Sequence, residues 1–234
     1  MPLALVTGGA AGLGLATAEA ALARGYRVAS LDLLPAPERP GLVSLIASID
    51  AALAALDSVP DLLVNNAGIV RFAPLLDTTT ADFARTIAIN LTGAFTVARA
   101  VAARMIPRGS GVIVNITSIG GIQTSPGTNA YAPAKAGLAA LTELMALEWA
   151  PLGLRVNSVA PGMIYGGMSS SVYADEGTRQ SRASAVPARR LGTEADIAEA
   201  VMFLASDGAS YVNGHQLVVD GGVTRATMAM IPRG

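Results

Sequence analysis

Short apolar segments recur along the chain, separated by longer segments in which apolar and polar residues mix. Within each short segment consecutive positions are apolar, which is typical of parallel strands that helices cover on both faces. The seven predicted strands are Leu3–Thr7, Arg27–Asp32, Leu42–Ala47, Leu62–Asn65, Val112–Thr117, Arg155–Ala160 and Gln216–Asp220.

The segments between these strands predict helices. They are Leu13–Arg24, Ile49–Leu56, Ala81–Met105, Ala130–Trp149 and Glu194–Ala205. Gly25 is placed to end the first helix, and Thr193 with Asp196 offers an N-cap and a first-turn acid for the last. The alternation predicts an α/β fold: a single-domain, Rossmann-type doubly wound sheet of seven mostly parallel strands with helices on both faces.

The segment 163–189 shows no strand pattern and is rich in Ser, Gly and Ala, with Tyr165, Met168 and Tyr173 interspersed. Long irregular segments in compact domains are usually functional lids or disordered. We expect a lid over a mostly apolar substrate pocket. The arginines in this segment and directly after it could reach an anionic substrate, but we interpret them as surface residues: Arg179, Arg182, Arg189 and Arg190.

Composition supports one compact domain over residues 1–234. Hydrophobic residues make up 52% and charged residues 14%, so disorder is excluded as the main state. Gly, Pro or a charge interrupts every apolar stretch short of the ~18 residues that cross a bilayer. The start, Met1–Ala23, lacks the pattern of a signal peptide. We therefore expect a cytoplasmic protein without membrane contact, whose tail Met228–Ile231 either covers a neighbouring subunit or frays.

Charge and rare residue types exclude several other classes. A net charge of −1 with scattered arginines gives no footprint for nucleic acid. The chain has no cysteine and one histidine, His215, so neither thiolate chemistry nor a multi-histidine metal site is available, and we expect no metal. A serine hydrolase is disfavoured, because G-x-S-x-G is absent and His215 would have to be the base.

A glycine-rich turn follows the first predicted strand and opens the first helix, at Gly8, Gly12, Leu13 and Gly14. Glycines let the backbone approach a pyrophosphate, whose charge the free N–H groups of the helix meet. The spacing alone is weak support, and its place between strand and helix strengthens it.

Asp32 closes the second strand, followed by Leu33. An acid here accepts hydrogen bonds from the ribose 2′-hydroxyl and repels a 2′-phosphate, which favours NAD over NADP. The alternative is an ordinary turn residue at a strand end.

Tyr131 and Lys135 lie four residues apart in a predicted helix, and Lys135 is the chain's one lysine. This spacing puts a phenol and an ammonium on one face. A neighbouring cation lowers a tyrosine pKa by roughly 1 to 3 units, which prepares it for proton transfer. From the pair alone, a solvated lysine beside a core tyrosine is the simpler interpretation.

These motifs together resemble the short-chain dehydrogenase/reductase family, over about Leu3 to Val223. Their order and spacing carry the resemblance: Thr7–Gly14, Asn65-Asn66-Ala67-Gly68, Asn90, Ser118, Tyr131-Ala-Pro-Ala-Lys135, Pro161-Gly162, the stretch Arg190–Asp207 and Val219-Asp220-Gly221-Gly222.

The resemblance implies roles for individual residues. Tyr131 would be the general base in alcohol oxidation and the acid in ketone reduction, and Lys135 would lower its pKa and bind the nicotinamide ribose. Ser118 would hydrogen-bond the reacting oxygen, and Asn90 would hold a water that links Lys135 to solvent. The remaining implied positions are Asn65, which ties neighbouring strands, Asn66, Ala67 and Gly68, which line the cofactor cleft, and Pro161, Gly162 and Ile164, which border the nicotinamide. Read singly, Ser118 and Asn90 also fit as caps or braces of local backbone.

The chain departs from the family pattern in two places. Only 32 residues separate Asp32 from Asn65, so the third strand and helix are trimmed, and Ser48 or Asp50 would have to serve at the adenine. Gly166 stands where many relatives have a threonine that touches the carboxamide. Ser169, Ser170 or Ser171 would be its replacement.

The resemblance thus implies an NAD-dependent oxidoreductase that interconverts a secondary alcohol and a ketone. The alternatives are an NADPH-dependent 3-oxoacyl-thioester reductase and a non-catalytic nucleotide-binding protein. Low charge on the helices Ala81–Met105 and Ala130–Trp149 predicts burial against partner copies, in a homotetramer or dimer.

Overall fold

A seven-stranded sheet forms the centre of the fold in this computed structural model, which describes residues 1–226; the tail Met228–Ile231 lies outside them. All of its pairings are parallel, in the order β3-β2-β1-β4-β5-β6-β9. The strands are β1 (Leu3–Thr7), β2 (Arg27–Leu31), β3 (Leu42–Leu45), β4 (Leu62–Asn65), β5 (Gly111–Ile116), β6 (Leu154–Pro161) and β9 (Gln216–Val219). The strand order reverses at β1, which pairs with both β2 and β4, so the ends of β1 and β4 flank the switch point where such sheets bind ligands.

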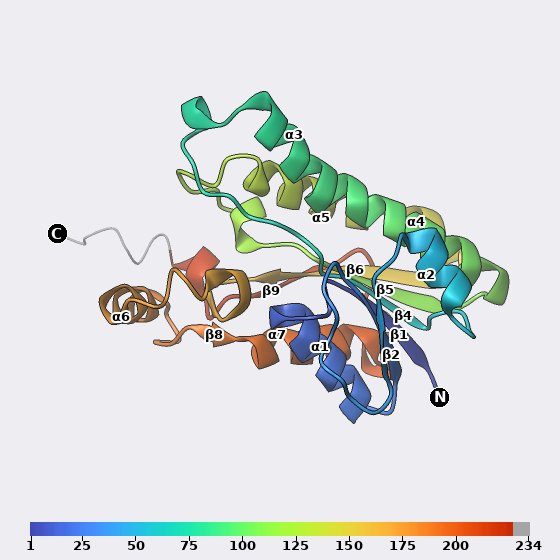
Figure 1. The fold of residues 1–234 in the computed structure, drawn as a ribbon. Helices are drawn as coiled ribbons and strands as arrows, with labels where there is room; N and C mark the ends of the chain where they lie inside the picture. The colour runs from blue at the N-terminus through green and yellow to red at the C-terminus, as the bar shows by residue number, and fades with distance from the viewer. Residues whose placement is uncertain (227–234) are drawn as a thin grey trace.

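Helices cover both faces of this sheet (Figure 1). The helices α2 (Ile49–Ala55), α3 (Thr80–Ile87), α4 (Ala94–Met105) and α5 (Tyr131–Trp149) lie on one side, and α1 (Gly12–Ala23) and α7 (Glu194–Ala205) lie on the other. The predicted doubly wound α/β fold is confirmed.

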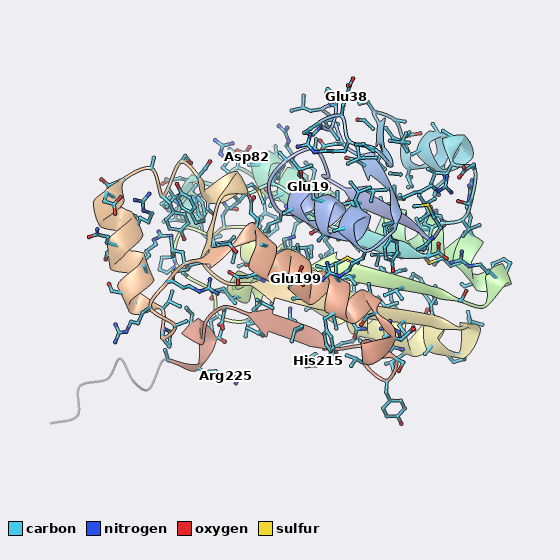
Figure 2. All side chains as sticks on the ribbon, turned by 90° about the horizontal axis from the view of Figure 1, so that it is seen from below. Glu19, Glu38, Asp82, Glu199, His215 and Arg225 are labelled. Atoms are coloured by element: carbon cyan, nitrogen blue, oxygen red, sulfur yellow. The ribbon has the colours of Figure 1, made fainter. Side chains whose placement is uncertain are left out.

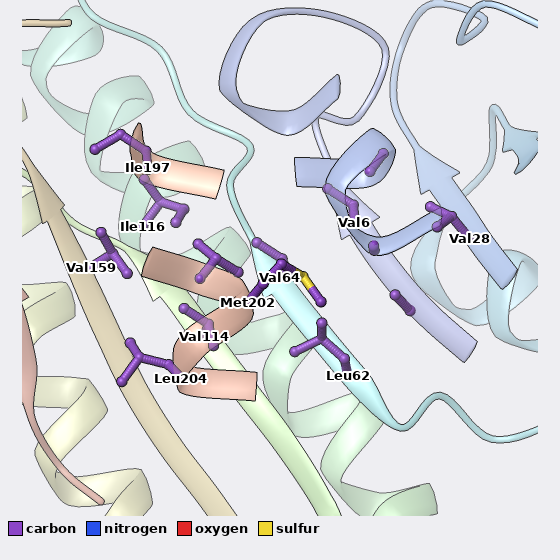
Figure 3. Packing of buried hydrophobic residues seen from close by; sticks show 14 of the residues in the cluster. Val6, Val28, Leu62, Val64, Val114, Ile116, Val159, Ile197, Met202 and Leu204 are labelled. Atoms are coloured by element: carbon purple, nitrogen blue, oxygen red, sulfur yellow. The ribbon is translucent and has the colours of Figure 1, made fainter. Parts of the chain in front are cut away.

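Two apolar cores lie between the sheet and these helices. Val6, Val64 and Val114 of the strands pack with Ile197 and Met202 of α7 (Figure 3). On the opposite face, side chains from the alternate strand positions pack against side chains of α4 and α5. The strand residues are Leu5, Leu63 and Ile113, and the helix residues are Ala98, Val101, Met105 and Met145. Because both faces of each strand are buried, the strands read as continuous apolar runs in the sequence.

The predicted helix Ala81–Met105 is continuous but not uniform. A π-helical segment, Ala88–Gly93, lies between α3 and α4, and Asn90 lies within it. Segments of this kind are rare inside α-helices and frequent at functional sites. The apolar periodicity predicted the helix but did not show the inserted segment.

The same helical stretch passes a test of length and mean hydropathy for a membrane span, although Arg85, Gly93 and Arg99 interrupt its apolar residues. By length and composition the 29 residues of Thr80–Arg108 qualify, with a hydropathy of 1.4. Ala98, Val101 and Met105 on its inner face belong to the core. Since core helices also pass such a test, this property of Thr80–Arg108 is weak support for a membrane span.

The segment 163–189 contains regular structure that the sequence did not predict. The strand β7 (Ile164–Tyr165) pairs in parallel with β8 (Gly192–Thr193), and the helix α6 (Glu176–Ala185) extends beyond the strand ends (Figure 1). Asp175 caps α6 by accepting a hydrogen bond from the Thr178 amide. Polar residues dominate α6, and none of them is buried, so the helix has no apolar periodicity to detect.

The predicted start of α7 is confirmed. The Thr193 hydroxyl accepts from the Asp196 amide, and the Asp196 carboxylate accepts from the Thr193 amide, which together form a capping box. Glu194 therefore occupies the first position of the helix.

Candidate functional site

The glycine turn between β1 and α1 is closed so tightly that a side chain would not fit. Gly8 and Gly12 have φ values of +66° and +57°, which favour glycine. A Cβ placed on Gly14 would lie 1.9 Å from the Gly8 carbonyl oxygen. The turn therefore brings backbone to the N-terminus of α1, beside Leu13, and this cradle suits a pyrophosphate group.

Asn66 and Thr7 hold this turn against the end of β4. The Asn66 side-chain amide donates to the carbonyl oxygens of Thr7 and Gly8, both at 3.1 Å. The Thr7 hydroxyl in turn accepts from the amides of Asn66 and Ala67, at 3.0 and 3.1 Å. The Asn66 side chain is thus committed to the turn, while Ala67 is exposed beside it.

Asp32, the residue after β2, binds the glycine turn through its carboxylate. One carboxylate oxygen accepts from the Ala10 amide at 2.9 Å, and the other accepts from the Leu33 amide at 2.6 Å and the Leu34 amide at 3.3 Å. A carboxylate has about four acceptor positions, so one remains for a ribose hydroxyl. The Leu33 side chain is 89% exposed next to it.

Of the two residues expected to serve at the adenine, Ser48 already has a hydrogen-bond partner within the protein. The Ser48 hydroxyl caps α2 by accepting from the Ala51 amide at 3.3 Å, and Asp50 lies exposed in the first turn of that helix.

Asn65 ties neighbouring strands, as the resemblance implied. Its amide donates to the Asn115 side chain on β5 at 3.0 Å and to the Ala94 carbonyl on α4 at 3.1 Å.

Tyr131, Lys135 and Ser118 converge where β5 ends and α5 begins. Tyr131 is the first residue of α5, and the Lys135 Nζ atom lies 5.7 Å from the centre of its ring. Ser118, two residues after β5, makes a side-chain hydrogen bond with Tyr131 and accepts from the Gly120 amide at 3.1 Å. The Lys135 ammonium donates to the Ile116 carbonyl at 2.7 Å. The structure thus brings together three of the four predicted catalytic side chains.

The electrostatics of this cluster differ from the sequence prediction. Burial raises the pKa of Tyr131 above its ordinary value, and the hydrogen bond with Ser118 opposes this only in part. Burial also lowers the pKa of Lys135 to about 8, because its side chain is 3% exposed and an ammonium is disfavoured away from water. The expected lowering of the Tyr131 pKa by Lys135 is therefore wrong for this structure, in which desolvation is the larger influence.

Asn90, the fourth predicted residue, is fully buried and positions the loop beside Lys135. Its amide donates to the Ile69 carbonyl at 2.9 Å and the Thr86 carbonyl at 3.0 Å, and its oxygen accepts from the Ile69 amide at 3.2 Å. A Cβ on Gly68 would lie 2.5 Å from the Asn90 oxygen and 3.6 Å from the Lys135 Nζ atom. Gly68 therefore lets this loop pass between Asn90 and Lys135.

The residues predicted at the nicotinamide lie at the end of β6. Pro161 is the last residue of the strand, and the Gly162 amide donates to the Val219 carbonyl at 2.9 Å. A Cβ on Gly162 would lie 2.6 Å from the Asp220 Cα, so the backbones are in close approach. The Ile164 side chain is 7% exposed and belongs to the core, which leaves only its backbone to face a ligand.

Glu194 lies beside the glycine turn, where the sequence predicted no side chain. A Cβ on Gly166 would lie 2.5 Å from a Glu194 carboxylate oxygen, so the glycine predicted as a departure from the family faces an acid. The predicted start of α7 was the available signal, because it placed an acid at the first helical position.

Arginines of the segment 163–189 have mostly local partners. Arg179 pairs with Glu176 and stacks at 5.6 Å over the Tyr165 ring, and Arg182 lies 5.5 Å over the Tyr173 ring. Both arginines project from α6, and Arg182 is exposed, which agrees with the surface interpretation.

The described part of the chain contains no cluster of side chains that could hold a metal ion. No set of three or more His, Asp or Glu side chains gathers there as a metal site. The His215 side chain is exposed at the start of β9, seen at the lower edge of Figure 2.

The fold and the glycine turn are of the kind found in dinucleotide-binding α/β proteins, and comparisons with known proteins agree. A family model described as enoyl-(acyl carrier protein) reductase matches residues 43–224. The 2-(R)-hydroxypropyl-CoM dehydrogenase of Xanthobacter autotrophicus is 39% identical over 245 residues, covering 95% of this chain and 98% of its own. The chain belongs to the short-chain dehydrogenase/reductase family.

Solved structures of relatives show the same fold with either form of the cofactor. A 4-hydroxyisoleucine dehydrogenase complexed with NADH has a TM-score of 0.89 and 28% identity, covering 96% of this chain and 99% of its own. A putative 2-deoxy-D-gluconate 3-dehydrogenase from Agrobacterium tumefaciens with bound NADP has a TM-score of 0.88 and 34% identity, covering 96% of both chains.

Proposed function

We propose that this protein is an NAD(H)-dependent oxidoreductase that interconverts a secondary alcohol and a ketone. The observation that carries the proposal is the cluster at the start of α5, where Tyr131 bonds Ser118 and lies 5.7 Å from the Lys135 ammonium. Contacts through Gly68, Ala67 and Asn66 connect this cluster to the glycine turn.

In the proposed mechanism a bound nicotinamide dinucleotide would supply the hydride in reduction and accept it in oxidation. Tyr131 accepts the proton of the alcohol in oxidation and returns one to the carbonyl oxygen in reduction, while the Ser118 hydroxyl holds that oxygen in place. Lys135 would bind the nicotinamide ribose, and its ammonium would offset part of the burial that favours the neutral phenol of Tyr131. Asn90 positions the loop at Gly68 and Ile69, and it would hold a water that links Lys135 to solvent.

The proposed cofactor is NAD, held along the switch point of the sheet. The pyrophosphate would be held by Gly8, Gly12, Leu13 and Gly14, and Asp32 would accept from the adenosine ribose beside Leu33. The rest of the proposed cofactor site consists of Asn66, Ala67, Gly68, Tyr131, Lys135, Pro161, Gly162 and Ile164. Asp32 supports NAD over NADP because its carboxylate would repel a 2′-phosphate.

A screen of secondary alcohols, sugars, steroids and hydroxyacyl thioesters with NAD⁺ and NADP⁺ tests the proposal. We expect turnover with NAD⁺ and an alcohol. An NADPH-dependent 3-oxoacyl-thioester reductase is the second candidate, because the matching family model carries an acyl-carrier-protein reductase description, and preference for NADPH with a thioester would establish it. Binding without turnover on the whole panel would indicate a non-catalytic nucleotide-binding protein.

The lid, the assembly and the location are part of the proposal. The segment 163–189 would cover the substrate. Exposed apolar side chains on the outer faces of α4 and α5, among them Phe95 (41%), Leu144 (51%) and Leu147 (77%), support a homotetramer or dimer. A monomeric mass in light scattering would contradict that assembly. The expected cytoplasmic location stays a prediction.

A further inference from the structure

The turn that begins the segment 163–189 lies directly on the N-terminus of α1. A Cβ placed on Gly12 would lie 3.1 Å from the Gly167 Cα, and a Cβ on Gly167 would lie 3.5 Å from the Gly12 Cα and 4.0 Å from the Leu13 amide nitrogen. These are backbone contacts between two glycine segments. The turn thus covers the N–H groups that the proposed function assigns to the pyrophosphate.

The Glu194 carboxylate lies beside this turn and the N-terminus of α1. A Glu194 oxygen would lie 2.5, 3.5 and 3.6 Å from Cβ atoms on Gly166, Gly167 and Gly12, respectively. The Glu194 side chain is half-buried, and no hydrogen bond or ion pair is found for it among residues 1–226. A helix N-terminus stabilises a nearby negative charge, so α1 offers Glu194 the environment that it would offer a phosphate.

The backbone of the turn is suited to movement. Gly166 and Gly167 have φ values of +128° and +51°, which favour glycine. The short helical turn that follows, Gly167–Ser169, has no buried residue. Few apolar contacts hold this turn against the glycine turn, so its local opening needs little packing to be broken.

We propose that Glu194 and the turn Gly166–Gly167 form a gate over the pyrophosphate seat, with the Glu194 carboxylate as an internal competitor for the bound dinucleotide. The cofactor enters after the turn has moved off Gly12. This inference rests on the proposed function only for the identity of the ligand, a dinucleotide with a pyrophosphate group.

Stopped-flow fluorescence of NADH binding to the purified protein tests the gate. Because opening precedes binding, we expect the observed rate of the wild-type protein to reach a plateau as NADH rises. Glu194→Gln keeps the size of the side chain and removes its charge, so we expect the plateau to rise and the NADH Kd to fall, each at least about threefold.

The matched control is Glu199→Gln, which makes the same change of charge on the same helix. Glu199 pairs on the surface with Arg24, which caps the C-terminus of α1, at the opposite end from the glycine turn. We expect its NADH Kd and plateau to stay within a factor of two of wild type.

Gly166→Ala opens the gate by a different route. The alanine Cβ would meet the Glu194 carboxylate, and the φ of +128° at this position is unfavourable for alanine. The substitution therefore strains the closed conformation of the turn. We expect the plateau rate to rise in Gly166→Ala. In the double variant with Glu194→Gln, we expect the fold-increase in the plateau rate to be smaller than the product of the two single-variant increases. Unchanged thermal unfolding of these variants shows that the fold is intact.

Three results would overturn the inference. One is an observed rate that rises linearly with NADH in the wild type. Another is an unchanged Kd in Glu194→Gln, and a third is tighter binding with an unchanged plateau, which shows charge repulsion without a gate. If the wild type and all variants bind neither NADH nor NADPH, the proposed function fails and the gate with it.

Discussion

Lys135 is 3% exposed, and its burial favours the neutral amine, while the burial of Tyr131 favours the neutral phenol. Both pKa shifts therefore oppose the pair of phenolate and ammonium that a lysine one turn after a tyrosine predicts. In the proposed mechanism, proton transfer at Tyr131 would then depend on the hydrogen bond with Ser118 and, in oxidation, on the positive charge of an oxidised nicotinamide beside it.

The proximity of these residues could be predicted from sequence, and their electrostatics could not. Spacing alone placed Tyr131 and Lys135 on one helical face, and the family resemblance placed Ser118 beside them. The pKa values depend on how deeply the neighbouring elements bury each group. The position of Lys135 also depends on the Ile116 carbonyl that accepts its hydrogen bond. That carbonyl belongs to β5, and no pattern within α5 shows it.

Asp32 determines the proposed preference for NAD at the scale of a single carboxylate. In Asp32→Asn the charge that repels a 2′-phosphate is lost, so we expect the ratio of kcat/KM for NAD⁺ over NADP⁺ to fall at least about tenfold, or ~1.4 kcal/mol. Steady-state kinetics with both cofactors measure this ratio.

Glu38→Gln is the control for Asp32→Asn, since Glu38 is an exposed acid on the loop that follows β2 (Figure 2). We expect it to leave the ratio unchanged. An unaltered ratio in Asp32→Asn would remove Asp32 from cofactor discrimination.

At the scale of elements, the glycine turn and α1 act as one unit. A Cβ on Gly14 overlaps the Gly8 carbonyl at 1.9 Å, so the turn and the first helical residues must separate in Gly14→Ala. Overpacking of this kind costs typically ~1–3 kcal/mol. We expect that loss in the free energy of unfolding, together with a rise of at least about tenfold in the NADH Kd, measured by denaturant titration and fluorescence.

Gly177→Ala serves as the comparison for Gly14→Ala. Gly177 lies in the exposed helix α6, and a Cβ there meets only an Asp175 oxygen, at 3.4 Å. We expect stability equal to or above wild type, because alanine favours helices. Equal behaviour of the two variants would contradict the role of the turn.

Elements with a buried apolar face were predictable, and elements without one were not. The seven strands and the helices α1, α5 and α7 follow the predicted segments closely. The helix α6 has no buried residue, and the pair β7 and β8 is two residues long in each strand. Their positions depend on local capping by Asp175 and on contacts with α7, which hydrophobic periodicity does not record.

At the scale of the whole molecule, the sheet order brings residues far apart in sequence to one edge. The ends of β1, β4, β5 and β6 carry the glycine turn, Asn66, Ser118 and Pro161, respectively. This convergence was predictable, because parallel strands place their carboxyl ends at the same edge. The turn Gly166–Gly167 over that edge was not, since it depends on packing between segments that share no pattern.

Burial of Lys135 also affects the stability of the whole protein as pH changes. The folded state lowers the pKa of Lys135 to about 8, so between that pH and the ordinary lysine value the unfolded chain binds more protons. Stability from this group is therefore smallest below the folded pKa and rises as pH increases toward the unfolded pKa.

Lys135→Met removes this dependence on pH. The unfolding free energy of the variant minus that of wild type should fall by about 2 kcal/mol between pH ~7 and pH ~10. Urea titrations at several pH values measure it, and other titrating groups cancel because both proteins contain them. A difference that stays constant would show that Lys135 is not perturbed by burial.

The central claim is that Tyr131 exchanges a proton with the substrate beside a bound dinucleotide, and Tyr131→Phe tests it most directly. Turnover and NADH affinity are measured on the same preparation, with the best substrate of the screen. Since a positioned acid or base contributes ~10²–10⁴-fold, we expect kcat to fall at least about 100-fold while the NADH Kd stays within about threefold of wild type. Turnover within a few-fold of wild type, with the cofactor bound, would contradict the account.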